Sequence, residues 1–415
     1  MKKYGCIGKK LSHSFSKEIH AKLAPYSYEL IELREDELET FFAEKNFEAI
    51  NVTIPYKQAV IPFLDHISDI ARRIGAVNTV VNRCGKLYGY NTDYFGMKSL
   101  VERVGISLQN KKVLILGTGG TSKTARVLAE DMEASEILTV SRQSSAGSIT
   151  YNDAVTAHSD AEIIINTTPV GMYPDCDSAP IELSRFDRLC GVIDAVYNPL
   201  RTNLVLDAQE LGIRAEGGLY MLVMQAVAAV EKFLDVKIER SVADSVFAEI
   251  LLSKENIVLI GMPGCGKTTV SKCLKLDSFE LIDTDRKLEE SCSCTIKELI
   301  SARGEKYFRD LESDAVRDAA SSQCRIISTG GGAILRKENV KRLKQNGRLF
   351  FIDAKLSRLR ATGDRPLSST KEKLEKLYSE RIEIYRASAD VTVPDMETPD
   401  AESEYILSKR MELIK

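Results

Sequence analysis

The segment LIGMPGCGKTTVSK, from Leu259 to Lys272, follows the apolar run NIVLI and carries the pattern Gly-x-x-x-x-Gly-Lys-Thr. This pattern constrains the chain to a strand, a tight glycine loop and a helix, because the backbone N–H groups of the loop must surround a phosphate. In such a loop Lys267 reaches the outer phosphate oxygens, and the hydroxyl of Thr268 binds Mg²⁺. We therefore predict a P-loop domain with a parallel sheet in the last part of the chain.

A second glycine-rich turn, Gly117-Thr-Gly119-Gly120-Thr-Ser122, follows the strand-like run KKVLIL. It matches the dinucleotide fingerprint imperfectly, since Ser122 stands where a third glycine or alanine is usual. A helical run follows, and a second strand, ILTVS, ends about twenty residues on, as in a fold that presents bare backbone to a pyrophosphate. That strand ends in Arg142 without an acid, which favours NADP because a guanidinium pairs with a 2′-phosphate. A solvent-exposed arginine is the competing interpretation.

Short apolar runs alternate with helical patterns along nearly the whole chain, which predicts an α/β protein with parallel sheets. The runs EAINVTI and AVNTVV belong to a first block, and EIIINTT and GVIDAV continue the dinucleotide-fold pattern. We expect an α/β domain at residues 1–100 that is completed by helices in 219–252, a Rossmann-type domain at 101–218, and the P-loop domain at 254–415.

The composition excludes several classes of protein. The 415 residues are 44% apolar and 28% charged, as in an ordinary globular protein. The net charge of −3 means that the chain has no excess of basic residues to attract nucleic acid or anionic lipid. The nine cysteines lack the spacing of a zinc knuckle, and MKKYGCIGKK precedes no signal-peptide core. The run LYMLVMQAVAAV is too short to span a bilayer. We expect a cytoplasmic enzyme that acts on small molecules. The sequence gives no prediction of its oligomeric state.

Two carboxylates follow the strand-like run FELI in the P-loop block. Asp283 and Asp285 are two residues apart and face the same side of an extended backbone. One can support Mg²⁺ through water while the other orients a hydroxyl nucleophile. Asp353, which closes RLFFID, has the form of a Walker B acid and is a rival metal partner; periodicity does not decide between them. No Asn-Lys-x-Asp motif follows Thr268, which disfavours a GTPase.

Four segments of the first block, SHSFS, NVTIPYK, GAVNT and GYNTD, place hydroxyls, amides or charges at strand ends or turns, which suits a polyhydroxylated ligand. Lys57 and Asp93 form their only opposite-charge pair. A lysine held near a carboxylate can deliver a proton to a developing alkoxide, as the reduction of a ketone by hydride requires. A surface salt bridge is the alternative, and composition alone does not choose between the two.

The motifs SHSFSKEIH, NVTIPYK, GAVNTV, GYNTDYFG, GTGGTS, NTTPVGM and GGLYMLVMQA resemble those of shikimate dehydrogenase, in order and over about 250 residues. The resemblance implies a catalytic pair, Lys57 and Asp93, with Lys57 as the acid/base residue. It implies that Ser14 and Ser16 hold the substrate carboxylate, helped by Thr53, Asn78, Tyr197 and Gln225, and that Lys57 and Asp93 also contact the substrate. It implies that NADP(H) contacts Gly117, Thr118, Gly119, Gly120, Thr121, Ser141, Arg142, Ala195 and Gly218. The family often has Asn-Arg-Thr where this chain has Ser-Arg-Gln, so the arginine is kept while its neighbours differ.

Gln225 lies in the very apolar helical run LYMLVMQAVAAVEKFL. On composition alone it is a core position with a solvent-facing amide, and Met221 and Met224 are typical of core packing. In the resembled family this helix returns to the substrate domain, which implies that Gln225 lies over the ring hydroxyls of the substrate.

Residues 256–390 resemble shikimate kinase, a P-loop fold like that of nucleoside monophosphate kinases. The resemblance depends on the P-loop and DTD together with YFRDLE, IISTGGGAI, TGDRPL and YSERIEIYR, and TIKELISARGEKYFRDLE is an especially close match. It implies that shikimate is bound by Asp285, Arg309, Gly330, Gly331, Gly332 and Arg381. It implies that ATP is bound by Pro263, Gly264, Cys265, Gly266, Lys267, Thr268, Thr269 and Arg365, and Mg²⁺ by Thr268 and Asp283.

In this resemblance Lys267, Asp285 and Arg365 are catalytic, and Arg365 is the lid residue that closes on the transferring phosphate. Arg360 lies where an adenine-stacking arginine is expected, and Ser368 replaces the usual second leucine of the lid motif. Taken singly, an arginine in a run such as RIEIYR is typical of a solvated helix, paired with a glutamate at i+4. Because these arginines occur together with the P-loop and DTD in the order and spacing of the family, we favour the interpretation that they bind ligands.

Together the two resemblances predict a bifunctional shikimate-pathway enzyme with NADP(H), ATP and Mg²⁺ as cofactors and 3-dehydroshikimate and shikimate as substrates. The hydroxyl that hydride transfer makes would then attack the γ-phosphate. Two alternatives stay open: a dehydrogenase with an inactive, ATP-sensing kinase-like domain, and a non-catalytic nucleotide-binding scaffold.

Overall fold

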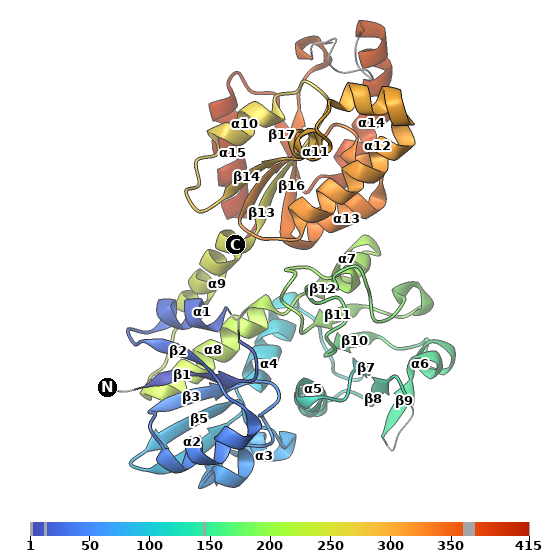
Figure 1. Cartoon of the computed structure of the whole chain (residues 1–415). Coiled ribbons are helices and arrows are strands. Elements are labelled where there is room, and N and C mark those ends of the chain that lie inside the picture. The colour runs from blue at the N-terminus through green and yellow to red at the C-terminus, as the bar shows by residue number, and fades with distance from the viewer. Residues whose placement is uncertain (1–2, 12–14, 144–146, 360–369, 415) are drawn as a thin grey trace. The chain divides into compact units, whose positions relative to one another are not determined.

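A computed structural model describes residues 3–11, 15–143, 147–359 and 370–414, and the chain divides into two compact units, Met1–Ile250 and Leu251–Lys415 (Figure 1). Each unit is an α/β structure, which confirms the predicted fold class. Nowhere in the described ranges does a helix have the length and apolar character that a membrane crossing requires.

The first sheet of the N-terminal unit has six strands in the order β2-β1-β3-β5-β6-β4. β1 is parallel to β2 and β3, but β5 runs antiparallel to both β3 and β6, so this sheet is mixed and not all-parallel as expected. The reversal occurs at Cys84-Gly85, whose φ angles of 52° and 84° suit a two-residue hairpin turn. The strands are β1 (Tyr4–Gly8), β2 (Tyr28–Glu32), β3 (Ala49–Val52), β4 (His66–Ile67), β5 (Thr79–Arg83) and β6 (Lys86–Tyr90).

Six helices accompany this sheet: α1 (Ser16–Leu23), α2 (Leu38–Glu44), α3 (Asp69–Ile74), α4 (Asp93–Val104), α8 (Leu219–Leu234) and α9 (Arg240–Lys254). The apolar helix α8 packs against α4 and α1. Gly96 of α4 permits the close approach, because a Cβ there would lie 2.5 Å from the carbonyl oxygen of Met221. This packing brings the middle of α8 beside the residues that follow β3 and β6.

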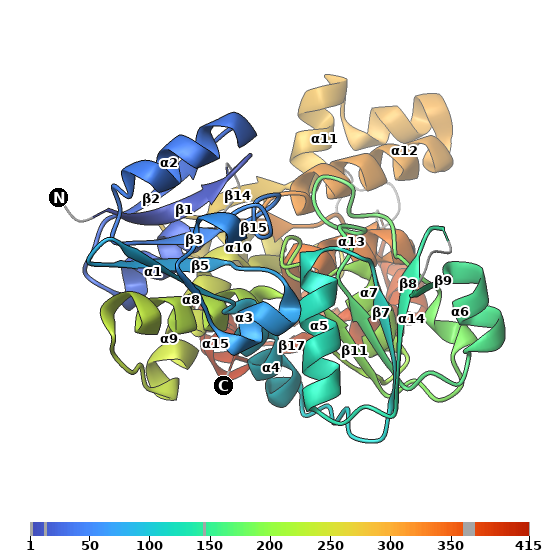
Figure 2. The ribbon, with the colours of Figure 1, turned by 90° about the horizontal axis from the view of Figure 1, so that it is seen from below.

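The second sheet of the same unit is all-parallel, in the order β12-β11-β10-β7-β8-β9. This is the order of a doubly wound dinucleotide fold, with its reversal between β7 and β10. Helix α5 packs against α3 and α4, so the glycine turn before it lies next to the first sheet (Figure 2). The elements are β7 (Lys112–Leu116), α5 (Gly120–Asp131), β8 (Glu136–Ser141), β9 (Ser148–Thr150), α6 (Tyr151–Ala157), β10 (Ile163–Asn166), β11 (Gly191–Asp194), α7 (Asn203–Glu210) and β12 (Arg214–Glu216).

The C-terminal unit has one parallel sheet, in the order β14-β15-β13-β16-β17, around a core of apolar strand residues. Its central strand β13 is fully buried and leads directly into the P-loop. The strands are β13 (Asn256–Ile260), β14 (Glu280–Asp283), β15 (Arg325–Ser328), β16 (Gly347–Asp353) and β17 (Val391–Pro394). The helices are α10 (Lys267–Cys273), α11 (Thr284–Cys292), α12 (Ile296–Ala320), α13 (Lys337–Asn346), α14 (Lys371–Ser388) and α15 (Pro399–Glu412).

Candidate active sites

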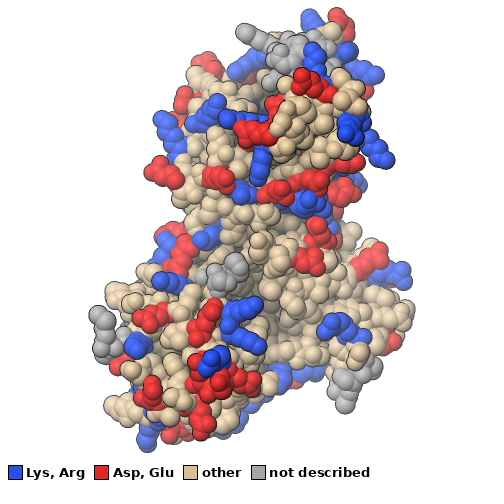
Figure 3. All heavy atoms as spheres, in the orientation of Figure 1, with Lys and Arg blue, Asp and Glu red and all other residues tan. Residues whose placement is uncertain are grey.

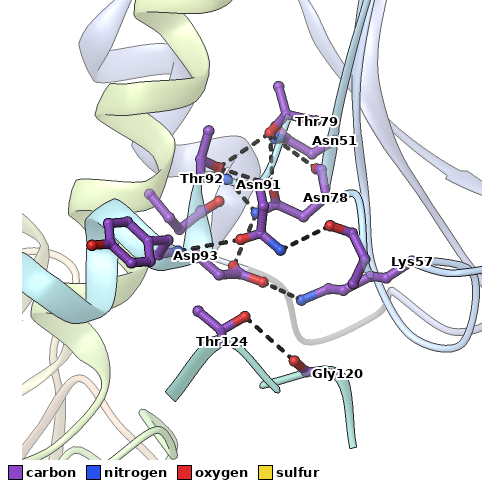
Figure 4. Close-up of polar contacts among 12 residues, drawn as sticks. Asn51, Lys57, Asn78, Thr79, Asn91, Thr92, Asp93, Gly120 and Thr124 are labelled. Carbon is purple, nitrogen blue, oxygen red and sulfur yellow. Dashed lines mark hydrogen bonds and ion pairs between the residues drawn. The ribbon is translucent and has the colours of Figure 1, made fainter. Parts of the chain in front are cut away.

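Lys57 and Asp93 meet inside the N-terminal unit. Lys57 lies in the turn after β3, and Asp93 is the first residue of α4. The Nζ of Lys57 donates to Oδ2 of Asp93 over 2.6 Å, and the two side chains are 17% and 11% exposed. Figure 4 shows the ammonium and carboxylate groups pointing toward each other. The pair is therefore largely buried, unlike a solvated surface salt bridge.

An amide network orients the carboxylate of this pair. Nδ2 of Asn78 donates to Oδ1 of Asp93 over 2.9 Å, and Oδ1 of Asn78 accepts from the backbone N–H of Thr92 over 2.7 Å. Behind it, Nδ2 of Asn51 donates to Oγ1 of Thr79 over 3.1 Å and to the carbonyl of Asn78 over 3.3 Å (Figure 4). The hydroxyl of Tyr28 in turn donates to Oδ1 of Asn51 over 2.7 Å. Both oxygens of Asp93 therefore have donors, and its rotamer is held from two sides.

Lys57, Asp93, Asn78 and Asn51 line a cavity of about 520 Å³. The structure brings together seven of the eight predicted substrate residues at its wall: Ser16, Thr53, Lys57, Asn78, Asp93, Tyr197 and Gln225. The eighth, Ser14, lies outside the described residues. The sequence analysis did not select six further lining residues: Cys6, Lys10 and Leu11, which lie outside the motifs, and Asn51, Val52 and Leu222, which lie within NVTIPYK or GGLYMLVMQA.

Helix α8 contributes both polar and apolar wall to this cavity. Gln225 is 8% exposed, and its Nε2 donates to the carbonyl of Leu222 over 2.9 Å. Met221, which was expected to serve core packing, is buried and also lines the cavity. The apolar composition of α8 gave no sign that one of its faces borders a cavity.

A second cavity, of about 1470 Å³, lies along the first glycine turn. Seven predicted NADP residues line it: Gly117, Thr118, Gly119, Gly120, Thr121, Ser141 and Arg142. The other two, Ala195 and Gly218, line the first cavity instead. Lys57 and Thr121 line both cavities, so the two spaces meet at the catalytic candidate.

The glycine turn suits a dinucleotide. Gly117 has a φ of +107°, and a Cβ there would lie 2.9 Å from Oγ1 of Thr167. A Cβ on Gly119 would meet no atom within 4 Å, so bare backbone faces open space that a pyrophosphate can fill. Arg142 is exposed at the end of β8. Burial raises the pKa of Tyr151, which the nearby charge of Arg142 partly offsets, and this tyrosine is a lining residue that sequence patterns did not suggest.

In the C-terminal unit the P-loop joins β13 to α10 through glycines with positive φ: Gly261 (151°), Gly264 (83°) and Gly266 (98°). Lys267 is 8% exposed, and its Nζ donates to the carbonyls of Gly261 over 2.9 Å and Met262 over 3.1 Å. The ammonium group is thus held over the loop itself. Of the other predicted ATP residues, Thr269 is exposed at the start of α10 and Pro263 packs on Gly331.

Thr268 distinguishes the two rival carboxylates. Its Oγ1 donates to Oδ2 of Asp283 over 2.9 Å, and Asp283 also caps α11 through the backbone N–H of Arg286. Asp353 lies instead 3.6 Å from a guanidinium nitrogen of Arg386. Within the described residues no group of three or more His, Cys, Asp or Glu side chains could hold a metal ion. A hydroxyl and one carboxylate fit Mg²⁺, which keeps waters and phosphate oxygens as its other ligands.

The predicted shikimate residues converge on the triple glycine after β15. A Cβ on Gly330 would lie 2.3 Å from Oδ1 of Asp285, and one on Gly332 would lie 1.9 Å from Nη1 of Arg309. The carbonyl of Gly331 accepts from Nη1 of Arg381 over 2.9 Å. The two arginines are 8% and 7% exposed, unlike solvated helix arginines. Burial, reinforced by the charge of a nearby glutamate, raises the pKa of Asp285 to about 6.

That glutamate is Glu312, which the sequence reasoning did not select. Its Oε2 accepts from Nη1 of Arg309 over 2.7 Å, and its side chain is 2% exposed. Its spacing of three residues from Arg309 on a helix is the signal that could have found it. Arg365 and Arg360 lie outside the described residues.

Comparisons with known proteins give matches to both parts of the chain. Family models described as shikimate dehydrogenase substrate binding domain and shikimate kinase match residues 6–80 and 263–412. A shikimate dehydrogenase (NADP(+)) from Clostridium perfringens is 35% identical over 269 residues, which are 60% of this chain and 98% of the relative. The structure of shikimate dehydrogenase 1 from Peptoclostridium difficile is 35% identical, with a TM-score of 0.56, over 60% of this chain and 98% of its own. The structure of a chorismate mutase/shikimate 5-dehydrogenase fusion protein from Clostridium acetobutylicum is 33% identical, with a TM-score of 0.57. The match covers 61% of this chain and 97% of that protein's chain.

Proposed function

Because this chain belongs to the shikimate dehydrogenase family and its C-terminal part matches the shikimate kinase family, we propose that it catalyses two consecutive reactions. The N-terminal unit reduces 3-dehydroshikimate to shikimate with NADPH, and the C-terminal unit phosphorylates the 3-hydroxyl of shikimate with ATP. In this proposal residues 1–100 and 219–252 bind the substrate of the first reaction, 101–218 bind NADP(H), and 254–415 form the kinase.

The observation that carries the first activity is the position of Lys57. It lies at the junction of the two cavities and 2.6 Å from Asp93. A ketone that gains a hydride needs a proton at its oxygen, and the ammonium group of Lys57 is placed to donate it. Asp93 orients the lysine through their ion pair, and Asn78 holds Asp93. NADPH, bound along the glycine turn with Arg142 at its 2′-phosphate, supplies the hydride.

The remaining cavity residues position the substrate. Hydroxyl and amide groups of Ser16, Thr53, Tyr197 and Gln225 surround a space that suits a ring with several hydroxyls. Such groups both donate and accept hydrogen bonds, so they can discriminate ring hydroxyls by position. We also assign Ser14 to this set, on the resemblance alone.

For the second activity, the supporting observation is the convergence of three groups around the P-loop and the triple glycine. Lys267 supplies a buried cation, the Thr268–Asp283 pair suits Mg²⁺, and Arg309 and Arg381 suit a carboxylate. Asp285 is placed beside Gly330 to orient the attacking hydroxyl. Phosphoryl transfer needs mainly positioning and charge neutralisation, which these residues can provide. Arg365 is assigned to the lid on the resemblance alone.

The purified full chain tests both activities separately. Loss of NADPH absorbance with 3-dehydroshikimate tests the first reaction, and ADP release with shikimate, ATP and Mg²⁺ tests the second. ATP binding without shikimate-dependent ADP release would contradict the kinase and leave the C-terminal unit as a nucleotide sensor.

A further inference from the structure

The cavity beside Lys57 carries an unbalanced positive charge. Among the described residues that line it, three are charged: Lys10, Lys57 and Asp93. Lys57 and Asp93 neutralise each other through their 2.6 Å ion pair. Lys10 makes no ion pair or hydrogen bond with its side chain to any described residue. The lining therefore has one net positive charge, and Lys10 is its source.

The backbone on both sides of Lys10 is held in place. The N–H of Lys9 donates to the carbonyl of Ile54 over 3.4 Å, and the N–H of Leu11 donates to Oε1 of Glu32 over 2.8 Å. The side chain of Leu11 is 4% exposed, which anchors the segment to the core. Lys10 thus projects from a fixed point at the cavity wall, while its own side chain is free to reach a ligand.

The attraction of an anion to this cavity depends on such local groups. The chain has a net charge of −3, and acidic and basic side chains are intermixed over the face drawn in Figure 3. The carboxylate of Glu32 accepts a hydrogen bond from the backbone N–H of Leu11 and forms no ion pair with Lys10. No other described lining residue offers a free cation to an acidic substrate.

We propose that Lys10 is a specificity-determining residue that binds the carboxylate of the substrate of the N-terminal unit. The inference rests on the proposed dehydrogenase function and deepens it, because it assigns a cation to a carboxylate that would otherwise contact only hydroxyls and amides. Lysine binds a carboxylate as a mobile point charge, and at the exposed wall of a cavity the contact is partly screened by water. Its loss should therefore weaken substrate capture more than turnover.

The test compares shikimate with shikimate methyl ester, which lacks the negative charge, in NADP⁺ reduction by the full chain. The variants are Lys10→Met, which keeps the stem and removes the charge, and Lys10→Arg, which keeps the charge. Lys9→Met is the matched control, because Lys9 is an exposed neighbour that does not line the cavity. Turnover of the methyl ester checks that the N-terminal unit of each variant is folded.

We expect Lys10→Met to lower kcat/KM for shikimate by about fivefold through KM, the scale of a partly screened ion pair. Its kcat/KM for the ester should stay at the wild-type value. Lys10→Arg should have a kcat/KM for shikimate close to that of the wild type, and Lys9→Met should change kcat/KM for neither compound. Equal effects of Lys10→Met on acid and ester, or none on either, would overturn the inference while leaving the dehydrogenase intact. A wild-type chain that oxidises neither compound would overturn the proposed function and this inference with it.

Discussion

The Nζ of Lys57 lies 2.6 Å from one carboxylate oxygen of Asp93, and the other oxygen accepts a 2.9 Å hydrogen bond from Asn78. This arrangement fixes the side chain of Lys57 at the place where the cavity beside Asp93 meets the cavity of the glycine turn. A proton donor so placed acts on the reacting oxygen and contributes less to binding of the remaining ring.

Replacement of Lys57 by Met should therefore lower kcat for 3-dehydroshikimate reduction by about 10²- to 10⁴-fold, the usual range for a positioned acid. KM for NADPH should change little, since the glycine turn is untouched. Steady-state NADPH oxidation measures kcat and the KM for NADPH. ADP release from added shikimate is the control, because the substitution leaves the C-terminal unit unchanged. A variant with unchanged kcat and a raised KM would show that Lys57 only binds substrate.

Tyr28 should act on the same site at a distance. Its hydroxyl is the donor to Oδ1 of Asn51, and Asn51 supports Asn78. Tyr28→Phe removes that donor and leaves a buried amide oxygen without a partner, so kcat should fall about three- to tenfold. Tyr26→Phe is the control, because its hydroxyl bonds Nδ1 of His20 in the same aromatic cluster and does not touch the amides. Equal losses in the two variants, or a loss that follows thermal stability alone, would contradict the positioning role.

Glycine spacing predicted both nucleotide loops because positive φ and close backbone approach admit few other residues. Other features depend on tertiary approach and have no local signal. Lys57 and Asp93 are 36 residues apart, and the pairing of β3, β5 and β6 in one sheet brings the start of α4 near the turn after β3. Lys10 belongs to no motif, and the antiparallel pairing of β5 with β6 depends on a hairpin turn, Cys84-Gly85, that is not a common turn sequence.

The choice between two metal-binding carboxylates shows the same limit. Asp283 and Asp353 both end parallel strands, and strand periodicity treats them alike. The structure separates them because Thr268 bonds Asp283, whereas Asp353 faces Arg386. We expect Asp283→Asn to lower shikimate-dependent ADP release by at least about 100-fold and to raise the Mg²⁺ concentration needed. Asp353→Asn should stay within about threefold of wild type. The reverse ranking in a Mg²⁺ titration would assign the metal to Asp353.

Stability of the N-terminal unit should depend on pH through Asp194. This carboxyl is fully buried, and burial raises its pKa from 3.8 to about 6 although Thr202, Val196 and Asn166 donate to it. A folded-state pKa above the unfolded value means that the stabilisation is fully present below about pH 4 and is lost as pH rises through 6. The loss totals about 3 kcal/mol, of which about half falls above pH 5.

Asp194→Asn should remove this dependence, because the amide oxygen can accept from the backbone and Asn166 while Thr202 accepts from the amide nitrogen. Thermal unfolding of both proteins between pH 5 and 7.5 measures the effect, with the N-terminal transition identified by its shift with NADP⁺. The wild type should lose stability relative to the variant as pH rises. Parallel pH profiles would mean that Asp194 does not titrate in this window.

The central claim is that the two units act in sequence on one compound, and ADP formation from 3-dehydroshikimate measures it most directly. The full chain with 3-dehydroshikimate, ATP and Mg²⁺ should release ADP only when NADPH is present, in an amount that approaches the NADPH oxidised. Lys57→Met should abolish this release yet keep ADP formation from added shikimate. Lys267→Ala should keep NADPH oxidation and abolish ADP formation from either compound. If NADPH is oxidised and no ADP forms, even with shikimate supplied, the account of a bifunctional enzyme is wrong.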